Sequence, residues 1–158
     1  MGYEAIILVI AWIITSIGLI IFVPKIKIRE AIVIFLFKQL ITWVVGLLVA
    51  ELGLIIYPIR SFAYATQASF DFEYFIYPAI CVIFNLHYPV GTKPLRQLIH
   101  YFSYCSAITI IEVIIERNTD IIDYVHWEWY VTWITLFITF WVSRKFYLWF
   151  FKLNKKNV

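Results

Sequence analysis

The sequence predicts an all-α integral membrane protein, a single-domain bundle of five transmembrane helices over residues 1–158. Hydrophobic residues make up 63% of the chain, and its mean hydropathy is +0.86. Only 15% of the residues are charged, against roughly 25% in soluble globular domains. A soluble protein needs more polar surface than this, so we expect the outer surface to face lipid.

The apolar segments have the length of a membrane span, which takes about 20 residues. Tyr57-Pro58 is expected to end the second span, since proline cannot continue a helix. Ser69 or Asp71 is expected to cap the third span, and Pro78 to kink it. Residues 144–151 are expected to lie at the membrane interface. The predicted spans are residues 5–23, 31–56, 71–88, 95–116 and 127–143.

The distribution of Lys and Arg predicts the orientation of the bundle. Only Arg60 and Arg117 fall on one side of the five-span arrangement. The basic residues on the other side are Lys25, Lys27, Arg29, Lys93, Arg96, Arg144, Lys145, Lys152, Lys155 and Lys156. Cytoplasmic loops carry the excess of Lys and Arg, so the N-terminus is predicted outside and the C-terminus in the cytoplasm. This basic rim suits anionic lipid head groups, and we do not interpret it as a nucleic-acid site.

Polar side chains recur at helical spacing on several spans, and such stripes belong at helix–helix contacts. The stripes are Glu4, Ala11, Thr15 and Gly18; Tyr74, Pro78, Cys81, Asn85 and Tyr88; Tyr101, Cys105, Thr109, Glu112 and Glu116; and Glu128, Thr132, Thr135, Thr139 and Ser143. We therefore expect them to point into the bundle.

Acidic residues gather in the outer half of this arrangement, and an ionisable residue inside a membrane is a candidate functional residue. The candidate site comprises Glu51, Glu112, Glu116, Glu128, Arg60, His126, Thr109 and Thr132. One interpretation is an outward-facing acidic pocket for a cation or small cationic solute, whose carboxylates would suit a hard divalent ion. The other is an ion-paired network that joins the helix ends.

Lys38 lies about two turns inside the second span, and we expect it to snorkel to the interface along its four-carbon stem rather than to serve as a buried amine. Cys81 and Cys105 are expected to be buried thiols that behave as small apolar residues. His87 and His100 flank the turn between the third and fourth spans, where a structural role is expected. The motifs of known hydrolases and nucleotide-binding proteins are missing from the sequence, and no cofactor is evident.

Three classes of function follow from these residues. The first is a module that binds or transports a cation or small solute. The second is a structural or interaction subunit of a larger membrane assembly, as a homo-oligomer or with another membrane protein. The third is a small enzyme acting on a lipid-linked substrate, with Glu112 and Glu116 as its acid–base pair. We favour a non-enzymatic role.

Six stretches together resemble an uncharacterised family of small polytopic membrane proteins found in spore-forming Firmicutes. They are FLFKQLITW at 35–43, ELGLIIYPIR at 51–60, FEYFIYP at 72–78, FNLHYP at 84–89, EVIIE at 112–116 and HWEWYVTW at 126–133. The resemblance covers nearly the whole chain. It implies a location in the bacterial cytoplasmic or spore membrane, and it assigns no role to any residue.

Overall fold

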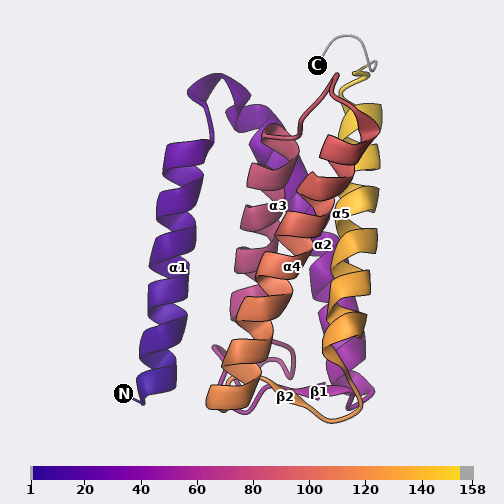
Figure 1. The fold of residues 1–158 in the computed structure, drawn as a ribbon. Coiled ribbons are helices and arrows are strands. Elements are labelled where there is room, and N and C mark those ends of the chain that lie inside the picture. Colours follow the sequence, from indigo (N-terminus) through magenta and orange to yellow (C-terminus); the bar gives the residue numbers. More distant parts are fainter. Residues whose placement is uncertain (1, 154–158) are drawn as a thin grey trace.

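Five α-helices run along a common direction in the computed structural model of the protein, which describes residues 2–153 (Figure 1). The helices are α1 (Tyr3–Phe22), α2 (Ile28–Glu51), α3 (Tyr77–Leu86), α4 (Pro94–Asn118) and α5 (Trp129–Phe150). A short 3₁₀-helix, Lys25–Lys27, precedes α2, and a π-helix, Phe70–Ile76, leads directly into α3. Lys155 and Lys156 of the predicted basic side lie outside the described residues.

The predicted helical architecture is confirmed, and three of its segments are long and apolar enough to cross a membrane. They are α1, the continuous segment Lys25–Glu51, and α4. Helix α1 lies at the edge of the bundle (Figure 1) and packs on α3 and the π-helix. Large apolar side chains cover its outer face, with Ile14 65% and Ile20 80% exposed. Contact of such an apolar surface with water is unfavourable, whereas contact with lipid tails is not.

The predicted end of the second span is wrong. Helix α2 ends at Glu51 rather than Ile56, because the chain turns at Gly53 with a φ of 64°, a conformation that favours glycine. Strand β1 (Ile55–Ile56) then pairs antiparallel with strand β2 (Asp123–Tyr124), so the protein is not purely α-helical. Helix α5 runs without a break to Phe150, so most of the segment 144–151, predicted to lie at the interface, continues the same helix.

Pro78 explains how the π-helix and α3 are held against α2. Proline has no N–H, and the chain changes here from π to α hydrogen bonding, so the carbonyls of Tyr74 and Glu73 are both left without helical donors. Two side chains of α2 replace them: Gln39 Nε2 donates to Tyr74 O at 2.9 Å, and Thr42 Oγ1 donates to Glu73 O at 2.6 Å. Ser69 caps this segment by accepting from the Phe72 N–H, as one of the two predicted caps.

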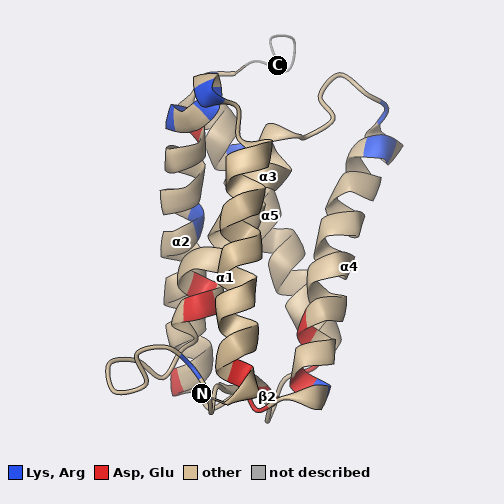
Figure 2. Ribbon diagram, turned by 90° about the vertical axis from the view of Figure 1, so that its left-hand side faces the viewer, with Lys and Arg blue, Asp and Glu red and all other residues tan. Residues whose placement is uncertain are grey.

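Charged residues separate to the two ends of the bundle (Figure 2). Lys and Arg residues gather where α1 leads into α2 and where α4 begins, and most Asp and Glu residues lie toward the end that carries the β1–β2 ladder. We call these the basic end and the acidic end. Helix α1 begins at the acidic end, and α5 ends at the basic end (Figure 1).

The contact between Thr42 and the freed Glu73 carbonyl should be measurable. We expect Thr42→Val to lower the free energy of unfolding by about 1–2 kcal/mol, because it leaves a buried carbonyl without a donor. Ser103→Ala is the control, since the exposed Ser103 hydroxyl bonds only to the His100 carbonyl of its own helix. Unfolding of the purified protein by denaturing detergent measures both changes, and equal losses would contradict this role for Thr42.

Candidate functional site

A small cavity lies inside the bundle on the acidic side of its middle. Its volume is about 60 Å³, room for a few water molecules, since one needs roughly 10–15 Å³. Helices α2, α4 and α5, the π-helix, α3 and the two outer loops all contribute to its walls. The lining residues are Thr42, Val45, Gly46, Val49, Ile55, Tyr57, Glu73, Tyr77, Glu112, Trp127, Thr132, Thr135, Leu136 and Thr139.

Glu112 is the most fully bonded side chain of the cavity, and it is only 7% exposed. Tyr77 and Tyr124 donate their hydroxyls to its two carboxylate oxygens, each at 2.5 Å, and Thr132 Oγ1 lies 2.9 Å from Oε1. Trp127 Nε1 in turn donates to Thr132 Oγ1 at 2.8 Å. Three hydroxyl groups from three segments thus converge on one carboxylate and hold its position.

Glu73 brings a second carboxylate into the same cavity. The π-helix projects it toward Gly46 of α2, where a Cβ atom would lie 2.7 Å from Glu73 Cγ. Glycine at residue 46 therefore makes the room that the Glu73 side chain occupies. The Glu73 carboxylate has one hydrogen bond among the described residues, a long contact of 3.4 Å from the Tyr57 hydroxyl. Fewer hydrogen bonds therefore hold this carboxylate than hold that of Glu112.

Two phenols from the outer loops act as donors at the cavity. Burial raises the pKa of Tyr57, and the neighbouring carboxylates Glu73 and Glu112 raise it further. Burial followed by the charge of Glu112 raises the pKa of Tyr124. Both phenols therefore keep their protons, and each can donate to a carboxylate while its oxygen lone pairs accept or coordinate another group.

Lys38 lies beneath the cavity floor, and the expectation that it snorkels is wrong. Its side chain is 0% exposed. The ammonium donates to Thr139 Oγ1, whose residue lines the cavity, and lies 4.7 Å from the centre of the Phe140 ring. Lys38, Thr42 and Gly46 follow one another at intervals of four residues, so one face of α2 supplies the floor and one wall.

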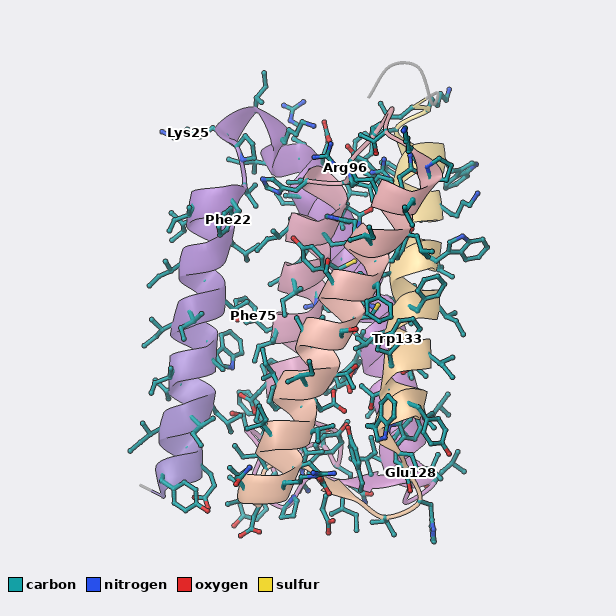
Figure 3. The ribbon with its side chains drawn as sticks, viewed as in Figure 1. Phe22, Lys25, Phe75, Arg96, Glu128 and Trp133 are labelled. Carbon is teal, nitrogen blue, oxygen red and sulfur yellow. The ribbon has the colours of Figure 1, made fainter. Side chains whose placement is uncertain are left out.

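The structure brings together only part of the predicted site. Glu112 and Thr132 meet at the cavity. Glu51, Glu128 and His126 are exposed and line no part of it; Glu128 lies at the acidic end, beyond the cavity (Figure 3). Glu51 falls in the last turn of α2, where the helix has already reached the outer surface.

Three other predicted residues also lie apart from the cavity. Arg60 is half-buried and folds its own loop, donating to the carbonyls of Tyr57, Ala63 and Thr66. Glu116 is half-buried one turn beyond Glu112. Thr109 is buried, but it borders a groove between α4 and α5, and its hydroxyl has no partner among the described residues. The predicted pairing of Arg60 with the outer carboxylates is therefore not formed.

Sequence reasoning missed the second carboxylate and the aromatic donors. Glu73 is one of several acidic residues in the outer half of the predicted arrangement, and nothing in the sequence sets it apart from the others. The signal that could have found it is Pro78, which frees carbonyls around residue 73, together with polar residues spaced four apart on α2. Cys81 and Cys105 are buried free thiols, as predicted.

Asp71 has a structural role at the acidic end. It accepts hydrogen bonds from Trp12 Nε1 at 2.9 Å and from the backbone N–H and hydroxyl of Ser61 at 3.0 and 2.9 Å. These bonds tie α1 and the outer loop to the start of the π-helix, so the carboxylate is fully occupied.

Comparisons with known proteins assign no relative to the chain, since no protein-family model, curated protein or solved structure matches it. Within residues 2–153, no three His, Cys, Asp or Glu side chains converge as a metal site would require. The geometry of the cavity must therefore carry any functional conclusion.

The space at Gly46 gives a direct test of the cavity geometry. We expect Gly46→Ala to displace the Glu73 carboxylate and to lower the melting temperature, because the new methyl group overlaps Glu73 Cγ. Gly18→Ala is the matched control, since its Cβ would meet only Ile83 Cδ1 at an ordinary 3.6 Å. That variant should be neutral or slightly stabilising, since alanine favours a helix. A stable Gly46→Ala protein with an unchanged cavity would contradict this geometry.

Proposed function

We propose that the protein is a multi-pass membrane protein whose bundle binds one small monovalent cation between Glu73 and Glu112. The observation that carries this proposal is two carboxylates, on different segments, lining one cavity inside an apolar bundle. A charge buried in a membrane protein needs a compensating partner. The cavity offers one such partner, Lys38, for two carboxylates.

Counting the charges supports a monovalent ligand. With both glutamates ionised and Lys38 protonated, the cavity and its floor carry one negative charge in excess. One alkali-metal or ammonium ion neutralises it. A divalent ion fits less well, because its usual sites collect more carboxylates and no three acidic, His or Cys side chains converge within residues 2–153.

The size and the oxygen donors of the cavity support the same ligand. A volume of about 60 Å³ suits an ion with one or two waters and is too small for an extended polyamine. The carboxylate oxygens of Glu73 and Glu112 and the hydroxyl of Tyr57 provide the oxygen ligands that hard cations prefer. This narrows the sequence-based expectation of a cationic solute to a small ion.

Binding is better supported than transport. Below the floor, Phe84 and Phe140 are fully buried and their ring centres lie 4.7 Å apart. The ammonium of Lys38 stands between the cavity and this packed layer, and it repels any cation that moves further toward the basic end. The arrangement therefore supports a site reached from the acidic end.

The enzymatic alternative receives less support. A lateral groove of the kind that a lipid-linked substrate needs lies between α4 and α5, but Glu112 and Glu116 are absent from the residues that line it. A structural role for the carboxylates is the remaining alternative, and the cation titration below distinguishes it.

We further propose the five-span arrangement, with the acidic end outside and the basic end in the cytoplasm. The separation of charge in Figure 2 supports it, because Lys and Arg concentrate on the cytoplasmic side of membrane proteins. The family resemblance would place the protein in a bacterial cytoplasmic or spore membrane. In that orientation the cation reaches the cavity from outside the cell.

The cation proposal is tested by melting temperature in detergent. Lithium, sodium, potassium and ammonium chlorides are titrated against choline chloride at constant ionic strength. We expect at least one small cation to raise the melting temperature, because a ligand that binds only the folded state stabilises it. Protons compete for the same carboxylates, so the half-saturating cation concentration should rise as the pH falls.

Substitutions assign the effect to the cavity. Glu73→Gln and Glu112→Gln should each raise the half-saturating concentration at least tenfold, equivalent to about 1.4 kcal/mol. Glu51→Gln and Glu128→Gln remove the same charge from exposed positions and should leave it within twofold. The carboxylates are structural if no cation raises the melting temperature more than choline does at any pH, and if both cavity variants are markedly less stable than the wild type.

Cysteine labelling tests the orientation. In a background with Cys81 and Cys105 replaced by Ser, we expect Tyr64→Cys to react with an impermeant maleimide in intact cells, since Tyr64 is fully exposed in the loop after α2. Thr92→Cys should react only after the membrane is permeabilised, because residue 92 lies in the turn between α3 and α4. Labelling of Thr92→Cys in intact cells would refute the orientation.

A further inference from the structure

A second, larger pocket lies at the basic end, away from the cation cavity. Its volume is about 590 Å³. The turn between α3 and α4 forms one side, and the facing surfaces of α4 and α5 form the others. No carboxylate lines it: the residues are Tyr88, Val90, Gly91, Thr92, Pro94, Gln97, Leu98, Tyr101, Phe137, Trp141, Arg144, Lys145 and Leu148. Both charged residues in this set are basic.

Arg144 is the most informative residue of this pocket. It is 5% exposed, yet its hydrogen bonds within residues 2–153 are limited to one, from Nη1 to the Asn85 carbonyl at 3.2 Å. Its Nε is buried without any acceptor. The guanidinium lies 4.2 Å from the centre of the Tyr88 ring, which holds it flat against the pocket wall. A buried arginine whose N–H donors lack acceptors favours the binding of an anion, which would accept those hydrogen bonds.

Other groups in the pocket favour the same kind of ligand. Helix α4 begins at Pro94 on the pocket rim, so the partial positive charge of a 25-residue helix is directed there. Arg96 lies on this first turn, at the basic end (Figure 3). Lys145 is exposed beside Arg144 and lies 5.6 Å from the Trp141 ring. Arg144, Lys145 and the start of α4 thus place positive charge around a space that no acidic side chain lines.

The remaining walls are apolar. Leu98 and Trp141 are about half exposed on the outer face of the bundle, and Phe137 and Leu148 lie beside them on α5. In a membrane these side chains border the acyl chains, while the basic groups lie at the head-group level, the arrangement that basic pockets between transmembrane helices use to bind anionic lipids. We propose that this pocket binds a phosphate group, supplied by an anionic phospholipid whose chains lie along Leu98 and Trp141.

The test is the melting temperature of the intact purified protein in detergent, titrated with phosphatidylglycerol, phosphatidylcholine or inorganic phosphate. We expect phosphatidylglycerol to stabilise the wild type and phosphatidylcholine to stabilise it much less. If inorganic phosphate stabilises the protein and phosphatidylglycerol does not, the pocket binds phosphate, but its ligand is a soluble phosphate rather than a lipid. No shift with either phosphatidylglycerol or inorganic phosphate would overturn the proposal.

Variants locate the effect. Arg144→Gln should raise the half-saturating phosphatidylglycerol concentration at least tenfold, and Arg144→Lys, which keeps the charge but loses the planar fork, should raise it less. Lys145→Gln, at an exposed position that the fold does not need, should raise it about threefold. Arg29→Gln is the control, since it removes an exposed charge from the same end but outside the pocket. If Arg144→Gln does not fold, the test is the comparison of Lys145→Gln with Arg29→Gln. Equal half-saturating phosphatidylglycerol concentrations for these two variants would overturn the proposal.

Discussion

Pro78 cannot donate a backbone hydrogen bond, and the position of Glu73 follows from that missing N–H. Inside an apolar bundle a carbonyl without a donor is costly. The two carbonyls left free by Pro78 and by the change from π to α hydrogen bonding must therefore find donors on a neighbouring helix. Gln39 and Thr42 supply them, and in doing so they fix the depth of the π-helix along α2. At that depth Glu73 stands opposite Gly46, where a larger residue would exclude it.

Helical periodicity predicted those parts of the site that lie on regular helices. The stripe of Tyr101, Cys105, Thr109 and Glu112 is buried as expected, and Thr132 faces it from α5. Periodicity failed where the helix is not regular. A π-turn changes the angle between successive side chains, so the stripe predicted through Tyr74 and Pro78 did not show where the Glu73 side chain points. Glu51 was misplaced because the sequence pattern did not show that α2 stops before Gly53.

The buried charges show why single-residue expectations about Lys38 and Arg144 were insufficient. A lysine two turns inside a span can snorkel, but Thr139 and Phe140 from α5 offer it a hydrogen bond and a ring face within the bundle. Arg144 was assigned to the basic rim by counting charges, yet it packs against Tyr88 and the Asn85 carbonyl. In both cases the partners that fix the position of the side chain come from helices distant in sequence. Composition alone does not predict such contacts. The packed layer of Phe84 and Phe140 lies between these two basic residues, so the proposed sites can act independently.

At the acidic end, the residues that line the cavity belong to the two loops there, residues 52–69 and 119–128, rather than to the helices. Tyr57 and Ile55 come from the chain around β1, and Trp127 follows β2, so the short β1–β2 ladder fastens the two loops together. Ile121 and Ile122 are almost fully buried beneath it. If an ion binds here as proposed, its path toward the acidic end passes these loops, since Lys38 and the Phe84–Phe140 layer lie on the other side of the cavity. Under the proposed cation binding, loop substitutions that loosen the ladder should therefore change the exchange rate more than the affinity.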